Sequence, residues 1–175
     1  MPFYLRTTKK SFTDGSLGAG IIQAVGKNVS KVAVGDKVLL SYYSCSNCAH
    51  CKASRPTYCT EFNLENYVGR KWTGMVCKDS DEEAWARFFG QSSFAEYTLA
   101  AETSVVNVSG LLQNDEELNL FAPLGCGFQT GMGAVANVAD AGPDDVVMVM
   151  GMGAVGMAAL MVRLLPCLFG VYTSM

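Results

Sequence analysis

The feature that most constrains this chain is a run of four cysteines between residues 45 and 59, with the spacing C-x2-C-x2-C-x7-C. Two residues between cysteines allow a tight turn that directs both sulfurs to one point, and four thiolates complete a tetrahedron around Zn²⁺. Because that shell leaves no open coordination position, the run predicts a structural zinc site that pins a polar loop. The predicted ligands are Cys45, Cys48, Cys51 and Cys59.

Other interpretations of the run stay open. Bacterial ferredoxins also begin with C-x2-C-x2-C, but their next cysteine follows after three residues and precedes a proline, and neither holds here. The run also fits a segment that binds no metal. A free-standing zinc ribbon is a further alternative, although ribbons place their cysteines in two separated pairs. Because four thiolates complete the shell, we expect His50, inside the run, to be a surface residue.

Composition restricts the compartment and the partners. The 175 residues are 50% hydrophobic and 17% charged, which is enough apolar content for a buried core. A net charge of −3 without a basic run argues against nucleic-acid binding. The odd number of cysteines, 7, fits poorly with paired disulfides, and Met1–Arg6 does not resemble a secretory signal. A reducing, cytoplasmic location is therefore expected.

The first part of the chain shows the pattern of short antiparallel strands. Four segments are strand-like, and the first two of them are rich in Val and Ile and punctuated by Gly. They are residues 18–26, 32–40, 94–100 and 104–108. The first fourteen residues show no periodic pattern, and residues 60–92 are expected to be irregular. We predict a small β-barrel with the cysteine run as an excursion, and a domain boundary near residue 113.

The character of the sequence changes over residues 114–175. Asn114 precedes three acidic residues, which indicates the start of a helix, and residues 134–139 also favour helix. Val146–Met150 is predicted to be a fully buried strand, and residues 167–172 a further strand. This βαβ-like order predicts the beginning of a parallel sheet, so the fold class is α/β with a β-barrel part.

The apolar stretch 146–171 also admits a membrane-spanning interpretation. Arg163 is its only charge, and its length is sufficient to cross a bilayer. Several glycines and Pro166 interrupt it, however. A strand, a glycine turn and a helix over residues 154–165 that stops at Pro166 are therefore favoured.

The glycine turn has the pattern G-x-G-x-x-G, directly after the predicted strand. In a dinucleotide-binding turn the first glycine permits the sharp bend, the second lets a pyrophosphate approach the backbone, and the third lets helix and strand pack closely. The alternative is that the glycines serve close packing alone. The predicted NAD or NADP contacts are Gly151, Gly153, Ala154, Val155 and Gly156. No acidic residue follows Asp145, so the sequence does not select between the two cofactors.

Together these features resemble the zinc-dependent alcohol dehydrogenases of the medium-chain dehydrogenase/reductase superfamily. Beside the cysteine run and the glycine turn, the resemblance rests on residues 18–26, 35–39, 89–97 and 123–131. It implies a partial GroES-like β-barrel domain over residues 1–113, truncated at its N-terminus, and an incomplete Rossmann-like dinucleotide-binding domain over residues 114–175. Residues 89–97 are similar to the aryl- and benzyl-alcohol branch. The implied reaction is NAD(P)-dependent interconversion of a primary alcohol, aromatic in that branch, and its aldehyde.

The resemblance also implies a catalytic zinc ion with three protein ligands. Cys126 matches one ligand, and Thr130 matches a residue of the nicotinamide pocket. Ser16 and Leu17 replace the His and Glu of the family's Gly-His-Glu motif, and no cysteine precedes Cys45. Neither replacement is a good zinc ligand, so we expect negligible activity from the isolated chain. The alternative function is a catalytically inactive, truncated family member that retains only the structural zinc lobe.

The expected partner is a small alcohol or aldehyde, with neither nucleic acid nor membrane. The family dimerises largely through an edge of the Rossmann sheet that this sequence lacks. Self-association into a homo-oligomer through exposed apolar surface is therefore expected.

Overall fold

A computed structural model describes residues 2–7, 18–68, 70–76, 83–86, 88–142 and 144–164. Their contacts divide the chain into two compact units, Met1–Ala122 and Pro123–Met175. Helix α2 (Asp115–Phe121) contacts strands of the first unit and belongs to it, although the composition of the sequence changes near residue 113.

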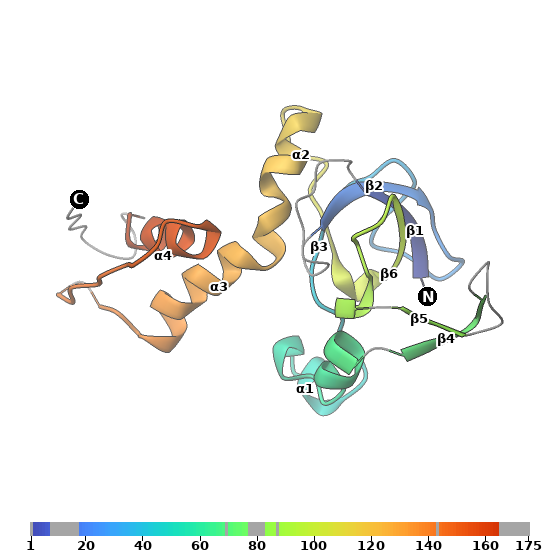
Figure 1. Ribbon diagram of the computed structural model, residues 1–175, viewed down its shortest axis with the longest axis horizontal. Helices are drawn as coiled ribbons and strands as arrows, with labels where there is room; N and C mark the ends of the chain where they lie inside the picture. The colour runs from blue at the N-terminus through green and yellow to red at the C-terminus, as the bar shows by residue number, and fades with distance from the viewer. Residues whose placement is uncertain are drawn as a thin grey trace. The chain divides into compact units, whose positions relative to one another are not determined.

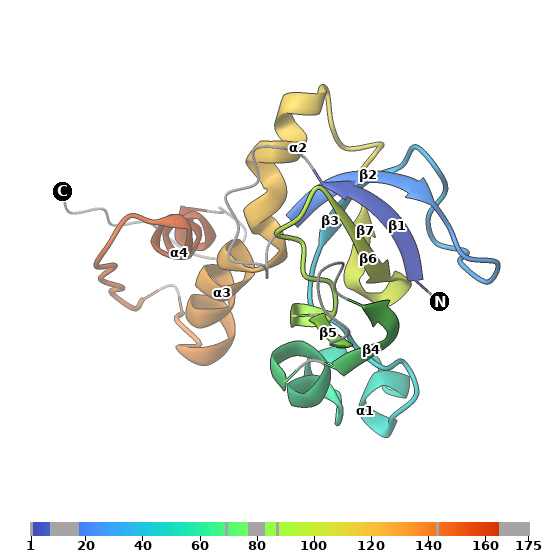
Figure 2. The same ribbon diagram turned by 45° about the vertical axis from the view of Figure 1, so that its right-hand side comes forward.

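The first unit is built on a five-stranded antiparallel sheet with the strand order β6-β1-β2-β3-β7. Figures 1 and 2 show that its long strands curve strongly. The strands are β1 (Pro2–Thr7), β2 (Gly18–Ala24), β3 (Lys37–Leu40), β6 (Tyr97–Ala101) and β7 (Val105–Asn107). Four of them lie in the segments predicted as strands, which confirms those predictions.

Strand β1 was not expected from the sequence, because its residues lack polar–apolar alternation. It nevertheless lies inside the sheet, paired with β2 on one side and β6 on the other. Its register with β2 shifts between Tyr4 and Leu5, an irregularity of the β-bulge kind. Two hydrogen-bonded neighbours define this strand where its own pattern does not.

The core of the sheet consists of aliphatic side chains. Ile22, Val38, Leu40 and Ala100 are fully buried, and Val32, from the turn before β3, completes the cluster. Burying such side chains contributes about 1.5–3 kcal/mol each for Val, Leu and Ile. The turn itself closes because the Ala33 N–H donates to the Asp36 carboxylate at 2.8 Å.

Residues 60–92 are more regular than predicted. They contain a π-helical turn (Leu64–Val68), a hairpin of β4 (Arg70–Val76) and β5 (Glu83–Ala86), and a 3₁₀ turn (Phe88–Gly90). The expectation of an irregular segment was wrong, because cross-strand pairing supplies regularity that the mixed composition of these residues conceals.

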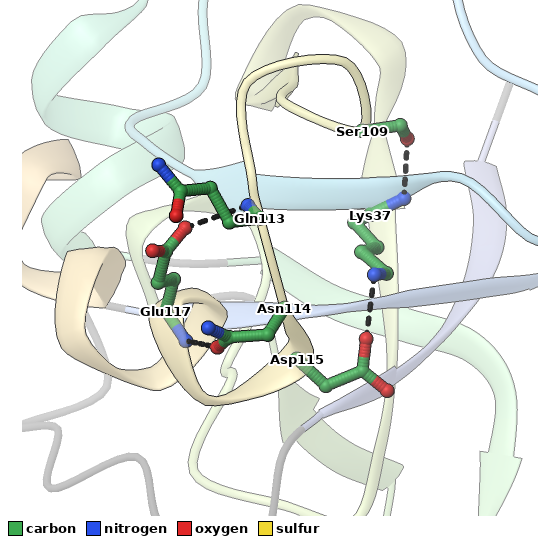
Figure 3. A network of polar contacts seen from close by, with 6 residues as sticks. All are labelled: Lys37, Ser109, Gln113, Asn114, Asp115 and Glu117. Carbon is green, nitrogen blue, oxygen red and sulfur yellow. Dashed lines mark hydrogen bonds and ion pairs between the residues drawn. The ribbon is translucent and has the colours of Figure 1, made fainter.

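Helix α2 begins where the sequence predicts. Asn114 accepts a hydrogen bond from the Glu117 N–H at 3.1 Å, and the Glu117 carboxylate accepts one from the Gln113 N–H at 2.8 Å (Figure 3). The Lys37 ammonium pairs with Asp115 at 2.5 Å, which ties the first turn of the helix to β3. The cysteine run, residues 45–59, forms a lobe that contains helix α1 (Ala49–Lys52). Figures 1 and 2 place α2 and this cysteine lobe at opposite ends of the unit.

The second unit consists of helix α3 (Gly127–Gly133), a π-helical continuation (Ala134–Val138) and helix α4 (Ala154–Leu164). The two α-helices approach closely at Gly131, where a Cβ atom would lie 2.1 Å from the Val155 carbonyl oxygen. Val135, Ala141, Ala159 and Val162 form the buried cluster between them. The predicted helix over 154–165 is confirmed to Leu164, and residues 165–175, with the predicted strand 167–172, lie outside the described residues.

Val146–Met150 is not the fully buried strand that we predicted. The segment has no strand partner among the described residues, and Val146, Met148 and Met150 are 86%, 79% and 85% exposed. Only Val147 and Val149 pack against the apolar cluster. A strand becomes buried on both faces only when neighbouring strands and helices cover it, and the described residues provide cover on one side.

No helix in the described part of the chain combines the length and the apolar character needed to span a bilayer.

Candidate metal centre and glycine turn

The four cysteines of the predicted run come together. The Sγ atoms of Cys45, Cys48, Cys51 and Cys59 all lie within 4.8 Å of one another, and Cys59 is buried. The Cys45 and Cys51 sulfurs are 3.9 Å apart. Within the described residues this is the group of potential ligands with the geometry to hold a metal ion. Its all-sulfur donor set suits Zn²⁺ in a closed tetrahedral shell.

Backbone N–H groups surround the sulfurs. The Cys45 sulfur accepts from the N–H groups of Asn47 and Cys48, at 3.4 and 3.3 Å. The Cys48 sulfur accepts from the Cys51 N–H at 3.5 Å, which also caps the short helix α1 (Ala49–Lys52). Such donors stabilise the thiolate form of their acceptor sulfur. These hydrogen bonds close the tight turns that the C-x2-C spacing predicts.

Hydrogen bonds and burial give three of the cysteine thiols different pKa values. Hydrogen bonds from the N–H groups of Asn47 and Cys48 lower the pKa of Cys45. The N–H groups of Cys51 and Thr60 lower the pKa of Cys48 to about 5. Burial, followed by hydrogen bonding with Cys48, raises the pKa of Cys51 to about 12. Backbone N–H groups thus favour the thiolate form of Cys45 and Cys48.

The turns that carry the cysteines need unusual backbone conformations. Ser46 and Ser54 adopt φ angles of 56° and 57°, in the left-handed region. His50 is half-buried on α1, its ring 6.2 Å from the Tyr58 ring and outside the sulfur group. The structure thus places His50 beside the four-sulfur site and not in it.

The three glycines of the turn differ in backbone conformation and in the space around them. Gly151 bends the chain with a φ of 96°, and a Cβ at Gly153 would meet nothing within 4 Å. A Cβ at Gly156 would lie 1.8 Å from the Gly151 carbonyl oxygen. Helix α4 starts directly after Gly153, and the Met157 N–H donates to the Gly153 carbonyl at 2.9 Å. Gly156 therefore serves close packing, while the second glycine faces open space.

A hollow of about 560 Å³ lies beside this turn. It is lined by Gly131, Val147, residues 149–151 and residues 153–156, among others. The first N–H groups of a helix have no intrahelical acceptor, and together with the helix dipole they favour an anion. The hollow thus lies beside the start of α4 and beside Gly151 and Gly153, where a Cβ would meet nothing within 4 Å.

Cys126 and Thr130 lie one helical turn apart at the start of α3. Cys126 is the N-terminal flanking residue of this helix, is half-buried and forms no disulfide. The Thr130 hydroxyl donates to the Cys126 carbonyl at 3.0 Å and Thr130 is exposed. Among the described residues Cys126 does not belong to a group of three or more potential metal ligands, and Ser16 and Leu17 lie outside the described residues.

Sequence comparison now decides the family. The alcohol dehydrogenase GroES-like domain matches residues 3–110. The chain belongs to this family. It is 40% identical over 148 residues to a probable alcohol dehydrogenase of a Pseudomonas species, an alignment that covers 84% of this chain and 46% of the relative. The chain is a member of the zinc-dependent alcohol dehydrogenase family.

Solved structures agree with this membership. An alcohol dehydrogenase zinc-binding domain protein from Burkholderia ambifaria matches with a TM-score of 0.74 and 34% identity, covering 92% of this chain and 48% of that one. Benzyl alcohol dehydrogenase from Acinetobacter calcoaceticus matches with a TM-score of 0.72 and 32% identity, covering 92% and 47%. The chain spans less than half the length of these relatives. A partial GroES-like domain is therefore the fold of the first unit.

One residue near the metal centre was missed by sequence reasoning. Asn66 lies in the π-helical turn after the cysteines, is fully buried and hydrogen-bonds the backbone that leads into the cysteine run. An asparagine in an irregular stretch looks like an ordinary turn residue. Only its burial distinguishes it, and burial depends on contacts between residues far apart in sequence.

Proposed function

We propose that Cys45, Cys48, Cys51 and Cys59 bind one structural zinc ion. The observation that carries this proposal is the convergence of four sulfurs within 4.8 Å of one another. Backbone N–H groups that donate to the sulfurs give further support, because they help several thiolates to coexist. The bound ion would hold the two ends of the lobe together and contribute its binding energy to folding.

We further propose that the protein acts in zinc-dependent alcohol oxidation, interconverting an alcohol and an aldehyde with NAD or NADP. Membership of the family supports the reaction class, and the relatives include proteins named geraniol dehydrogenase and benzyl alcohol dehydrogenase. An aromatic or other apolar primary alcohol is the substrate class that these names favour. When bound, NAD(P) supplies the hydride acceptor for the alcohol carbon.

The cofactor's pyrophosphate is assigned to the glycine turn. Gly151 and Gly153 leave room for a phosphate against the backbone, and Ala154 and Val155 begin helix α4 beside the hollow. We assign Thr130 to the nicotinamide pocket and Cys126 to the catalytic metal by their match to the family. These residues belong to a Rossmann-like domain over residues 114–175, which we likewise propose.

A second candidate is a family member without catalytic activity that keeps the structural zinc lobe. It is favoured by Ser16 and Leu17, which stand where the family has His and Glu. A single thiolate, Cys126, does not define a metal geometry. A cytoplasmic location and self-association through exposed apolar surface fit either candidate.

Native mass spectrometry separates the two candidates. One zinc per chain, lost in Cys45→Ser and kept in Cys126→Ser, supports the structural site and the inactive candidate. Two metals per chain, together with NADH quenching of tryptophan fluorescence and alcohol-dependent NADH formation, support the dehydrogenase. A compact chain without any metal overturns the structural zinc site.

A further inference from the structure

We infer that Asn66 is a positioning residue for the metal centre, acting as a clamp that joins the two ends of the cysteine-bearing segment. This inference rests on the structural zinc site proposed above. It concerns a residue that neither binds metal nor belongs to the cysteine motif.

The carboxamide of Asn66 is engaged on both its oxygen and its nitrogen. Its Oδ1 accepts from the Tyr43 N–H at 2.8 Å, and its Nδ2 donates to the Tyr43 carbonyl at 3.0 Å. The same nitrogen donates to the Phe62 carbonyl at 2.9 Å. The residue is 0% exposed, so each of these bonds is shielded from competing water. The side chain pairs with Tyr43 as a neighbouring β-strand would.

The two partners flank the metal lobe. Tyr43 lies two residues before Cys45, and Phe62 lies three residues after Cys59. The Phe62 N–H also donates to the Cys59 carbonyl at 3.0 Å, and the Cys45 N–H donates to the Cys59 sulfur at 3.4 Å. One buried amide therefore fixes the entry and the exit of the segment that carries all four sulfurs.

Packing holds Tyr43 from another direction. Gly90 contacts this residue so closely that a Cβ on the glycine would lie 2.4 Å from the Tyr43 Cβ. Next to it, the Tyr42 and Phe62 rings pack with centroids 5.4 Å apart. The clamp thus orders the ends of the lobe without help from the metal. Because the segment is already ordered before the metal binds, metal binding carries a smaller entropy cost, and this raises the metal affinity.

The test is the zinc affinity of the full chain, measured by competition with a chromophoric chelator, and the absorption spectrum of the Co²⁺-substituted protein. Asn66→Leu keeps the approximate volume and removes all three hydrogen bonds. We expect its zinc affinity to fall about tenfold or more, as for other supporting shells of metal sites, and its thiolate–Co²⁺ bands to shift or weaken.

Two controls separate positioning from general destabilisation. Val38→Ala removes volume from the core of the sheet. Asn107→Leu removes an amide whose hydrogen-bond partners, Asp36 and Ser109, lie outside the cysteine segment. Both are expected to keep wild-type zinc affinity while they remain folded. Equal affinity losses in Asn66→Leu and the controls, or unchanged affinity in Asn66→Leu, overturn the inference.

Asn66→Asp serves if the leucine variant does not fold. It keeps the acceptor for the Tyr43 N–H but places a carboxylate oxygen against two carbonyl oxygens. Reduced zinc affinity is expected, and wild-type affinity would refute the clamp. Failure of the wild-type chain to bind zinc is a different result, because it rejects the structural zinc site before any variant is compared.

Discussion

The cysteine lobe and the glycine turn differ in how far apart in the sequence the residues that support each site lie. All four sulfurs come from residues 45–59, and the hydrogen bonds of Asn66 that hold the ends of this segment join residues 43, 62 and 66. The glycine turn instead follows a segment, Val146–Met150, whose alternate side chains are largely exposed. One site is assembled from nearby residues, whereas the other follows a segment that has no strand partner among the described residues.

This difference shows that the two regions depend to different degrees on residues far away in the sequence. A metal lobe carries its own ligands and backbone donors, so it retains its geometry wherever its ends are held. A dinucleotide turn takes its orientation from the sheet behind it. Measurements on each region test this contrast.

The largest effect is expected from metal removal. With free zinc about a thousandfold above Kd, binding stabilises the folded chain by about 4 kcal/mol, so a chelator should lower the urea midpoint strongly. Cys59→Ser should abolish this chelator effect, whereas Cys126→Ser should retain it. An unchanged midpoint on chelation would show that the lobe is held by its protein contacts alone.

Core substitution should separate the barrel from the exposed segment. Leu40→Ala removes a fully buried side chain from the sheet and should cost about 2–5 kcal/mol of unfolding free energy. Met150→Ala, at 85% exposure, should change it by less than about 0.5 kcal/mol. Denaturant unfolding measures both. A large loss for Met150→Ala would mean that this side chain is covered in solution.

Substitutions in the glycine turn should divide packing from binding. Gly156→Ala places a methyl group 1.8 Å from a backbone oxygen, so a backbone shift costing about 1–3 kcal/mol is expected in thermal unfolding. Gly153→Ala meets nothing within 4 Å and should leave stability unchanged. It should nevertheless weaken NADH binding, followed by fluorescence titration. Equal NADH affinity in Gly153→Ala and the wild type would contradict the assignment of the pyrophosphate.

The smallest effect concerns Glu102, in the first unit. N–H groups of Lys31 and Ser30 donate to its carboxylate and lower its pKa below the ordinary 4.5. A lowered folded-state pKa means stabilisation that is complete above the ordinary value and disappears as pH falls through the folded-state value. The stability difference between the wild type and Glu102→Gln should therefore shrink on acidification. Urea unfolding at about pH 7 and about pH 3 tests this, and a pH-independent difference would disprove it.

Prediction from sequence succeeded where the information is local. The cysteine spacing identified the sulfur group, Asn114 marked the start of α2, and the G-x-G-x-x-G pattern placed the start of α4. Each signal needs only a few neighbouring residues to take effect.

Prediction failed where contacts are distant. Strand β1 owes its identity to pairing with β2 and β6, and the β4–β5 hairpin arises inside a stretch of mixed composition. The apolar run Val146–Met150 indicated burial, but burial requires a cover that the run does not encode. Asn66 joins the two ends of the cysteine segment by bonding Phe62 and also Tyr43, which lies 23 positions earlier.

The contact between Gly90 and Tyr43 has a consequence for mutational tolerance. Position 90 combines a φ of 74° with a tyrosine 2.4 Å from where any side chain would begin. Asparagine, which accepts left-handed backbone better than most residues, still collides there. Saturation mutagenesis followed by selection for a folded lobe should therefore return only glycine at position 90. At position 88, two residues earlier, the same selection should return several large apolar residues.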